Sequence, residues 1–135
     1  MLLIKNLTVS ADNKEILHNT SIHFDVNKIY AIMGVNGSGK SSLAKTIMGT
    51  PTFTITSGEL LLNNQNINKL PPNERAQKGI FLAQQAPLAI SGVTVTQLLR
   101  SAISRDKMDS KKLLQEITNI SKKLEISKNM LYNTS

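Results

Sequence analysis

The stretch Gly34-Val35-Asn36-Gly37-Ser38-Gly39-Lys40-Ser41 fills the pattern G-x-x-x-x-G-K-[ST] without a mismatch. Glycine has no Cβ, so the backbone can curl until several N–H groups point at one place. A helix that begins at the end of the stretch adds free N–H groups and the positive end of its dipole. The stretch therefore predicts a loop that binds the phosphates of a nucleoside triphosphate.

The two residues that close the pattern have separate predicted roles. Lys40 carries a cation that can reach the β- and γ-phosphates, and the Ser41 hydroxyl can ligate Mg²⁺. We therefore expect ATP and Mg²⁺ as cofactors. The alternative is a glycine-rich turn that matches by chance. The apolar run before the loop and the helical pattern after it favour the phosphate loop over that alternative.

The residues on either side of the loop predict an α/β arrangement. Residues 29–33 (Ile-Tyr-Ala-Ile-Met) are continuously apolar, which predicts a strand covered on both faces, as in a parallel sheet. From Ser41 onward Leu43, Ala44 and Ile47 share a helical face, and Gly49 followed by Pro51 ends the helix.

Further strands and helices are expected along the chain. A strand pair is predicted at the start, with a polar turn at residues 10–14 between an apolar pattern over 2–7 and alternation over 22–26. Additional strands are expected at residues 58–62 and 80–83, and a helix start at residues 71–75.

The C-terminal part has a helical pattern. After a loop at residues 87–92, Thr94 to Gln97 fits a capping box, with the helix continuing through Leu98, Leu99, Ala102 and Ile103. Asp109 or Ser110 is expected to cap another helix. Its apolar stripe is expected to pack as core and consists of Leu113, Ile117, Ile120 and Leu124.

Composition narrows the classes of function. The 135 residues suit one domain, and the absence of cysteine excludes a disulfide scaffold, a Cys-ligated metal and a Cys nucleophile. Sixteen Lys and Arg against nine Asp and Glu give a net charge of +7, which raises the alternative of nucleic-acid binding. We favour no nucleic acid, because the C-terminal lysines interleave with apolar residues and few aromatic residues could stack on bases. With no export leader and no membrane span, we expect a cytoplasmic protein.

The motif and its surroundings resemble the ATP-binding-cassette ATPases. The segment GVNGSGKSSLAKTIMG is similar to their Walker A segment, SGEL follows at residues 57–60, and NERAQKGIFLAQQ at residues 73–85 resembles the run into the Q-loop. Within this family, TPTFTIT at residues 50–56 and GIFLAQQAPLAISGVTV resemble SufC, the ATPase subunit of the Suf iron–sulfur assembly system. The resemblance covers residues 1–105, and more loosely the helices beyond.

This resemblance implies a set of site residues. The phosphate and Mg²⁺ groups would be Lys40 and Ser41, and the nucleotide site would comprise Gly34, Val35, Asn36, Gly37, Ser38, Gly39, Lys40, Ser41 and Ser42. Gln85 aligns with the Q-loop glutamine, which in the family touches the Mg²⁺ shell and couples nucleotide to partner. The spacing to Pro87 favours Gln85 over Gln84, although either could be a solvated strand end.

The resemblance also implies partners and a division of the chain. Residues 1–85 would be part of the nucleotide-binding core and residues 86–135 part of the helical subdomain. Partners would be SufB- and SufD-like scaffold proteins and a second ATPase subunit, without direct membrane insertion. An ATPase subunit of a membrane transporter is the alternative function, and a non-catalytic nucleotide-binding fragment is a third.

Segments that the family uses for hydrolysis are not found in this sequence. It contains no Ser-Gly-Gly, and the acids after Gln85, namely Asp106, Asp109, Glu116 and Glu125, do not end a buried apolar strand. We therefore expect a partial ATPase domain whose C-terminal half is absent. We also expect that this chain alone does not hydrolyse ATP, because no general base or second Mg²⁺ carboxylate is identified.

Overall fold

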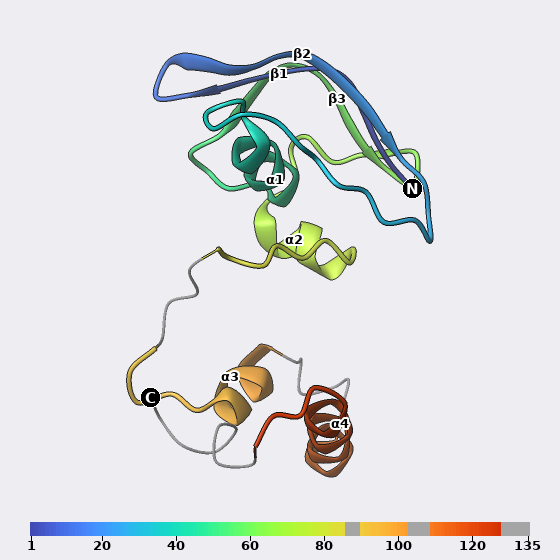
Figure 1. Cartoon of the computed structure of the whole chain (residues 1–135), viewed down its shortest axis with the longest axis vertical. Helices are drawn as coiled ribbons and strands as arrows, with labels where there is room; N and C mark the ends of the chain where they lie inside the picture. Colours follow the sequence, from blue (N-terminus) through green and yellow to red (C-terminus); the bar gives the residue numbers. More distant parts are fainter. Residues whose placement is uncertain (86–89, 103–108, 128–135) are drawn as a thin grey trace. The chain divides into compact units, whose positions relative to one another are not determined.

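A computed structural model describes residues 1–85, 90–102 and 109–127 of the chain (Figure 1). These residues form two compact units, 1–84 and 85–135, and each is described by itself. The expected loop at residues 87–92 and the expected helical residue Ile103 lie wholly or partly outside the described residues. Among the described helices, none has the length and hydropathy needed to cross a membrane.

The first unit is built on an antiparallel sheet with the strand order β2-β1-β3-β4. The central strand β1 (Leu2–Ala11) pairs with β2 (Lys14–Phe24) on one side and β3 (Thr54–Leu62) on the other, and β4 (Gln65–Asn66) pairs with β3. The predicted strand pair at the start and the predicted strand at residues 58–62 are confirmed, the latter beginning four residues earlier.

A bulge near Asn6 lets β1 bury residues that do not follow a period of two. Ile4 and Leu7 are both fully buried although they lie three positions apart. Asn6 between them has a positive φ of 46°, and the register with β2 shifts there. Gly58 of β3 packs so closely against this bulge that a Cβ would lie 2.3 Å from the Asn6 carbonyl oxygen. A glycine is therefore required opposite the bulge.

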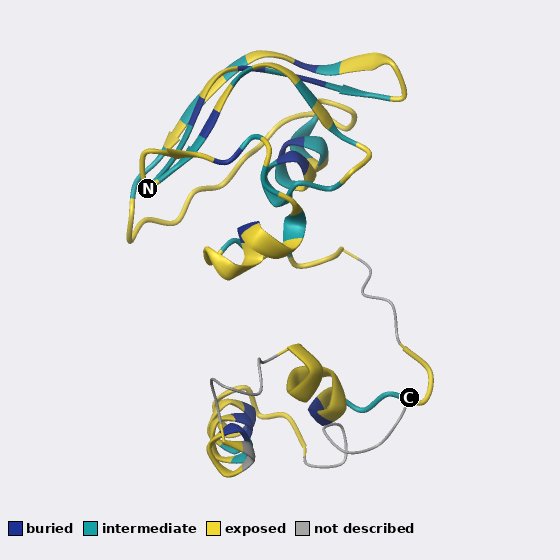
Figure 2. Cartoon of the chain, turned by 180° about the vertical axis from the view of Figure 1, so that it is seen from behind, coloured by how far each residue is buried: buried dark blue, intermediate teal, exposed yellow. Residues whose placement is uncertain are grey.

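Two helices accompany the sheet in the first unit. Helix α1 (Lys40–Met48) lies along the sheet, and the short helix α2 (Pro72–Gln77) follows it (Figure 1). Buried positions recur along the strands and on α1 (Figure 2). They form one core cluster, consisting of Ile4, Leu7, Val9, Leu17, Leu43, Leu60 and Ile67. The predicted helices after Ser41 and at residues 71–75 are confirmed.

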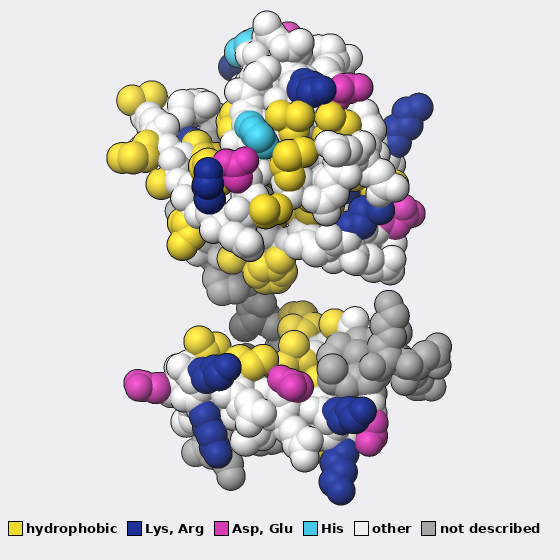
Figure 3. Space-filling model, turned by 90° about the vertical axis from the view of Figure 1, so that its right-hand side faces the viewer, with side chains coloured by type: hydrophobic (Ala, Val, Ile, Leu, Met, Phe, Trp, Pro, Cys, Tyr) yellow, Lys and Arg dark blue, Asp and Glu magenta, His cyan; other side chains and the backbone are white. Residues whose placement is uncertain are grey.

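Two predicted strands of this unit are wrong. Residues 29–33 and 80–83 have no strand pairing, Ile29 is 101% exposed and Phe81 is 88% exposed. Hydrophobic side chains accordingly stand out on the surface of the unit that carries both histidines (Figure 3). A strand forms only where another strand completes its hydrogen bonds, and the described strands all belong to the antiparallel sheet. An apolar composition alone therefore does not make these segments strands.

The second unit contains α3 (Val95–Ala102) and α4 (Ser110–Lys123). The predicted capping box of α3 is confirmed, because the Gln97 N–H donates to Thr94 Oγ1 at 3.1 Å and the Thr94 N–H donates to Gln97 Oε1 at 2.8 Å. Asp109 caps α4 by accepting from the Lys111 N–H at 3.3 Å.

The predicted apolar stripe of α4 is buried only in part. Leu113 and Ile117 are buried, but Ile120 is 52% exposed and Leu124 is also exposed. The prediction that all four residues pack as core is therefore wrong for the C-terminal half of the stripe. The spacing puts them on one face of the helix, but burial also needs a covering element, and among the described residues Ile120 and Leu124 are not covered by one.

Candidate nucleotide-binding site

The predicted phosphate loop lies at the N-terminus of α1. Gly37 and Gly39 have left-handed φ angles of 81° and 89°, and Gly39 is the residue that precedes the first helical position, Lys40. No side chain caps this end of α1. The first N–H groups of a helix have no partner within the helix, so this end has free donors and a positive partial charge. Such an end suits an anion.

Lys40 folds back over the loop from the first position of the helix. Its Nζ donates to the carbonyl oxygens of Gly34 at 2.7 Å and Val35 at 2.8 Å, and it lies 3.5 Å from Ser38 Oγ. Within the described part of the chain, no carboxylate contacts this ammonium group, so its charge is balanced only by neutral oxygens. The loop therefore concentrates a cation and free N–H groups at one exposed point of the surface.

The other predicted loop residues are accessible. Residues 34–38 and Ser41 are exposed, and Ser42 is half-buried with its carbonyl accepting from Thr46 Oγ1 at 2.8 Å. The structure brings residues 34–42 together in one loop and helix start. Gln84 is exposed at the end of the first unit, whereas Gln85 is the first residue of the second unit and is described only within that unit.

The described residues hold no preformed cluster of metal-binding side chains. No group of three or more His, Cys, Asp or Glu side chains gathers anywhere in residues 1–85, 90–102 and 109–127. The two histidines instead contact acids locally, His18 with Glu15 and His23 with Asp25. A cation such as Mg²⁺ would therefore depend on Ser41 together with oxygens brought by a ligand, which is how Mg²⁺ is held in many phosphate sites.

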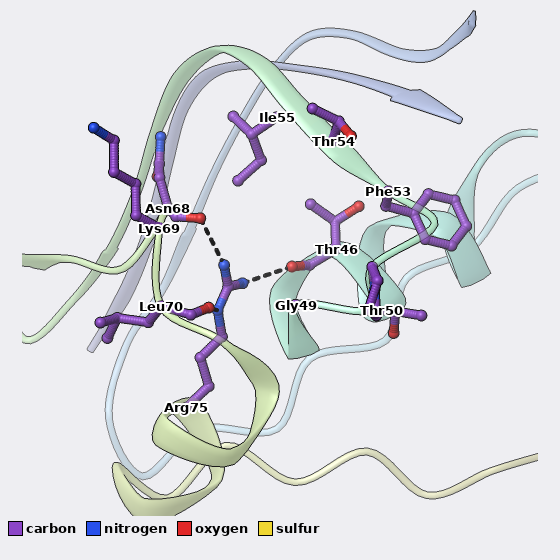
Figure 4. A pocket seen from close by; sticks show the side chains of 11 residues that line it. Thr46, Gly49, Thr50, Phe53, Thr54, Ile55, Asn68, Lys69, Leu70 and Arg75 are labelled. Carbon is purple, nitrogen blue, oxygen red and sulfur yellow. Dashed lines mark hydrogen bonds between the residues drawn. The ribbon is translucent and has the colours of Figure 1, made fainter. Parts of the chain in front are cut away.

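A buried arginine behind the loop helix was not predicted from the sequence. Arg75 of α2 is 2% exposed, and its guanidinium donates to four backbone carbonyl oxygens. Figure 4 shows the bonds to Thr46 and Asn68. Burial lowers the pKa of Arg75. The guanidinium lines a pocket of about 330 Å³ beside Gly49 and Phe53. A charged residue in a short polar helix gives no signal of burial, so periodicity could not have found it.

Residues 17–134 match the ABC transporter family. The chain belongs to the ABC transporter ATP-binding family. It is 43% identical over 113 residues to a probable ABC transporter ATP-binding protein of Streptococcus pyogenes serotype M18, covering 84% of this chain and 44% of that protein. It is also 43% identical over 126 residues to a probable ATP-dependent transporter of Synechocystis, covering 86% and 49% of the two chains. The chain thus spans about half the length of the curated relatives it matches.

Solved structures show the same fold in other ATP-binding cassettes. A nucleotide-free cassette from an ABC transporter gives a TM-score of 0.76 at 22% identity, covering 99% of this chain and 57% of that chain. A dimeric cassette in a post-hydrolysis state with ADP and Pi gives a TM-score of 0.74 at 24% identity, covering 99% and 61%. The predicted fold class, an α/β P-loop NTPase of the ABC type, is confirmed.

Proposed function

We propose that residues 34–42 bind ATP together with Mg²⁺. The observation that supports this most strongly is the position of Lys40, whose ammonium group lies against the carbonyl oxygens of Gly34 and Val35 at the uncapped start of α1. A phosphate oxygen offers this cation an oppositely charged partner in place of neutral carbonyls, so Coulomb attraction is added to the hydrogen bond. Free N–H groups of the first helical turn supply further donors.

Ser41 is the residue proposed to hold Mg²⁺. It is exposed in the first turn of α1, next to Lys40. A single hydroxyl fits a cation that keeps most of its ligands as water and phosphate oxygens. When bound, Mg²⁺ would supply positive charge that offsets the charge of the phosphate oxygens. Ser41 and Lys40 would then bind the same triphosphate from adjacent positions of one helix.

The role of Ser41 is tested by measuring ATP affinity with and without Mg²⁺. We expect Mg²⁺ to strengthen ATP binding by the wild-type chain at least about tenfold, which corresponds to about 1.4 kcal/mol. Ser41→Ala should lose most of this gain, whereas Ser57→Ala, which changes an exposed serine of β3, should keep it. An unchanged Mg²⁺ effect in Ser41→Ala would contradict the proposed ligand.

We further propose that the chain is the ATP-binding part of a SufC-type ATPase. The proposal rests on the resemblance of residues 50–56 and 79–95 to that family. Residues 1–85 would form part of the nucleotide-binding core and residues 86–135 part of the helical subdomain of a cytoplasmic protein. Gln85, or its neighbour Gln84, would touch the Mg²⁺ shell and relay the state of the nucleotide. The partners would be SufB- and SufD-like scaffold proteins and a second ATPase subunit.

An ATPase subunit of a membrane transporter is the second candidate. The names of the streptococcal and Synechocystis relatives describe an ABC transporter ATP-binding protein and an ATP-dependent transporter, which favours this candidate. Capture experiments with the tagged chain distinguish the two. Recovery of SufB- and SufD-like proteins, dependent on ATP and lost in Lys40→Ala, supports the SufC-type function. Recovery of a membrane permease under the same conditions supports a transporter.

A chain of this sequence is expected to bind ATP without turning it over. Phosphoryl transfer needs a complete set of charges and positioning groups around the γ-phosphate. The sequence contains no Ser-Gly-Gly signature and no apolar strand that ends in Asp-Glu. Phosphate release by the purified 135-residue chain should therefore equal that of Lys40→Ala, even with scaffold proteins added. Turnover that disappears in Lys40→Ala would contradict this expectation and exclude a binding-only function.

A further inference from the structure

The guanidinium of Arg75 joins two parts of the first unit that are distant in sequence. Its Nη1 donates to the carbonyl oxygens of Thr46 at 2.8 Å and Ile47 at 3.0 Å, both in the last turn of α1. Its Nε and Nη2 donate to Leu70 at 2.7 Å and Asn68 at 2.9 Å, in the turn before α2. Four of the five N–H donors of the side chain are therefore used on backbone oxygens.

The charge of Arg75 is balanced by the end of α1 and not by an acid. The acids that form ion pairs among the described residues are Glu15 and Asp25, and their partners are His18, His23 and Lys28. None of these ion pairs includes Arg75. The C-terminus of a helix carries a partial negative charge, which favours a cation there. Because the side chain is 2% exposed, the guanidinium depends on these carbonyl groups and cannot turn to water without moving the chain.

The surrounding residues are shaped to hold this contact. Gly49 follows α1 with a φ of 82°, and a Cβ at that position would lie 2.8 Å from Nε and 3.0 Å from Cζ of Arg75. The turn that supplies the other carbonyls is itself fixed to β3. The Asn68 side chain donates to the Gly58 carbonyl at 2.9 Å and accepts from the Leu60 N–H at 2.8 Å. Arg75 thus connects α1 to a turn anchored on the sheet.

The backbone of Arg75 also sets where the next segment begins. The Arg75 carbonyl accepts from the N–H groups of Lys78 and Ile80, each at 3.1 Å. Residues 80–84 leave α2 from this point and end at Gln84, and Gln85 is the next residue in the sequence. Arg75 contacts the last turn of α1, and Lys40 and Ser41 lie in its first turn. The helix has nine residues, so at 1.5 Å per residue it is about 14 Å long.

We propose that Arg75 is a positioning residue that relays binding at the 34–42 loop to residues 80–84. This inference rests on the proposed binding of ATP there. An anion bound at the start of α1 holds the whole helix more rigidly, including its last carbonyls, because a single short helix moves as one body. Arg75 transfers that constraint from Thr46 and Ile47 to its own backbone, and so to the segment that its carbonyl anchors.

Hydrogen exchange of the full chain, with and without ATP and Mg²⁺, tests the relay. In the wild type we expect ATP to slow exchange at least about threefold in residues 34–45 and also in residues 80–84. In Arg75→Gln, ATP should still slow exchange in residues 34–45, and the affinity for ATP should stay within about threefold of wild type. The slower exchange in residues 80–84 should be lost. The control is Lys78→Gln, which removes an exposed cation from the residue that directly follows α2. This variant should behave as wild type.

A second pair of variants keeps Arg75 and displaces it. Gly49→Ala drives a Cβ into the guanidinium, whereas Gly92→Ala imposes a comparable backbone strain at a φ of 78° with no atom within 4 Å. We expect Gly49→Ala to lose the ATP effect at residues 80–84 and Gly92→Ala to keep it. If Arg75→Gln does not fold, this pair decides the question.

The outcomes separate this inference from the proposed function. A wild-type chain that binds no ATP overturns both. ATP binding without slower exchange at residues 80–84, or a wild-type response there in Arg75→Gln and Gly49→Ala, overturns the relay and leaves ATP binding intact. Loss of thermal stability in Arg75→Gln with an undiminished response at residues 80–84 shows that Arg75 only supports the fold.

Discussion

The apolar segments of the first unit differ sharply in how far their side chains are buried. Leu60 in β3 is fully buried, whereas Ile29 is 101% exposed although it begins an apolar run over residues 29–33. β3 pairs with β1 on one side and β4 on the other, and its inner face meets the core. Residues 29–33 have no strand partner among the described residues, although the Tyr30 ring packs edge-on against Phe24. Burial therefore follows from available partners more than from composition.

Antiparallel and parallel strands differ in where their partner strands come from. β1 and β2 are joined by a two-residue turn at Asp12 and Asn13, both with positive φ, so their pairing is local. A parallel strand needs a crossover and a neighbour from a distant part of the chain. The chain spans 44% of the length of its streptococcal relative, and the described residues contain no parallel pair. The described residues thus form antiparallel pairs, both the local β1–β2 pair and the more distant β1–β3 pair, and they do not form the expected parallel ones.

The largest expected effect on stability comes from a substitution in the buried strand β3. Leu60→Ala should lower the free energy of unfolding by about 3 kcal/mol, because it leaves a cavity in the core. Ile29→Ala should change it by less than about 0.5 kcal/mol, as exposed substitutions usually do. Urea denaturation of the two variants measures both values. A loss of more than about 2 kcal/mol in Ile29→Ala would mean that residues 29–33 are buried in solution.

A smaller effect is expected in α3, where Leu98 and Leu99 are exposed. The helix is stabilised locally by the capping box between Thr94 and Gln97. Thr94→Ala removes the hydroxyl that accepts from the Gln97 N–H, and an N-cap of this kind is worth about 1 kcal/mol. Amide exchange in α3 should therefore become roughly fivefold faster, while Ser101→Ala in the same helix should change it little. Equal exchange in Thr94→Ala and wild type would show that the cap does not hold the helix.

The smallest effect concerns the start of the exposed segment. Asp25 accepts from Lys28 Nζ at 2.8 Å and from the Tyr30 hydroxyl at 3.0 Å, and these hydrogen bonds lower the pKa of Asp25 below 3.8. A lowered pKa means that the carboxylate stabilises the fold above pH 3.8, and that this contribution is lost as pH falls through the folded-state pKa.

Thermal unfolding at two pH values measures this contribution. The melting temperature of Asp25→Asn should lie below that of the wild type at about pH 6, and the difference should shrink as the pH falls below 3.8. Asp12→Asn, in the β1–β2 turn, serves as the control for loss of one exposed negative charge. A difference that stays constant over this range would show that Asp25 does not act through its ionised form.

Local sequence patterns predicted much of the fold. The β1–β2 pair, α1 with its stop at Gly49, the capping box at Thr94 and the cap at Asp109 all depend on residues within a few positions of one another. These features were predictable because the side chains that stabilise them are neighbours in the sequence. The predicted strand at residues 58–62 belongs to the same group, since it was indicated by an apolar run that ends in a turn at Asn63 and Asn64.

Features that depend on distant residues were not predictable. Residues 29–33 and 80–83 needed partner strands, and Ile120 and Leu124 needed a covering surface. The burial of Arg75 depends on Thr46 and Ile47, nearly thirty residues earlier in the chain. Of the candidate site, residues 34–42 lie together at the start of α1, while the roles assigned to them and to Gln85 stay predictions until binding is measured.

The affinity of the purified chain for ATP in the presence of Mg²⁺ tests the central claim most directly. Lys40→Ala removes the cation that lies over the loop, and Lys45→Ala removes an exposed cation from the last turn of the same helix. Binding should weaken at least about tenfold, or 1.4 kcal/mol, in Lys40→Ala, and should stay near the wild-type value in Lys45→Ala. Equal affinities in the wild type and Lys40→Ala would contradict the assignment of residues 34–42 as a phosphate loop.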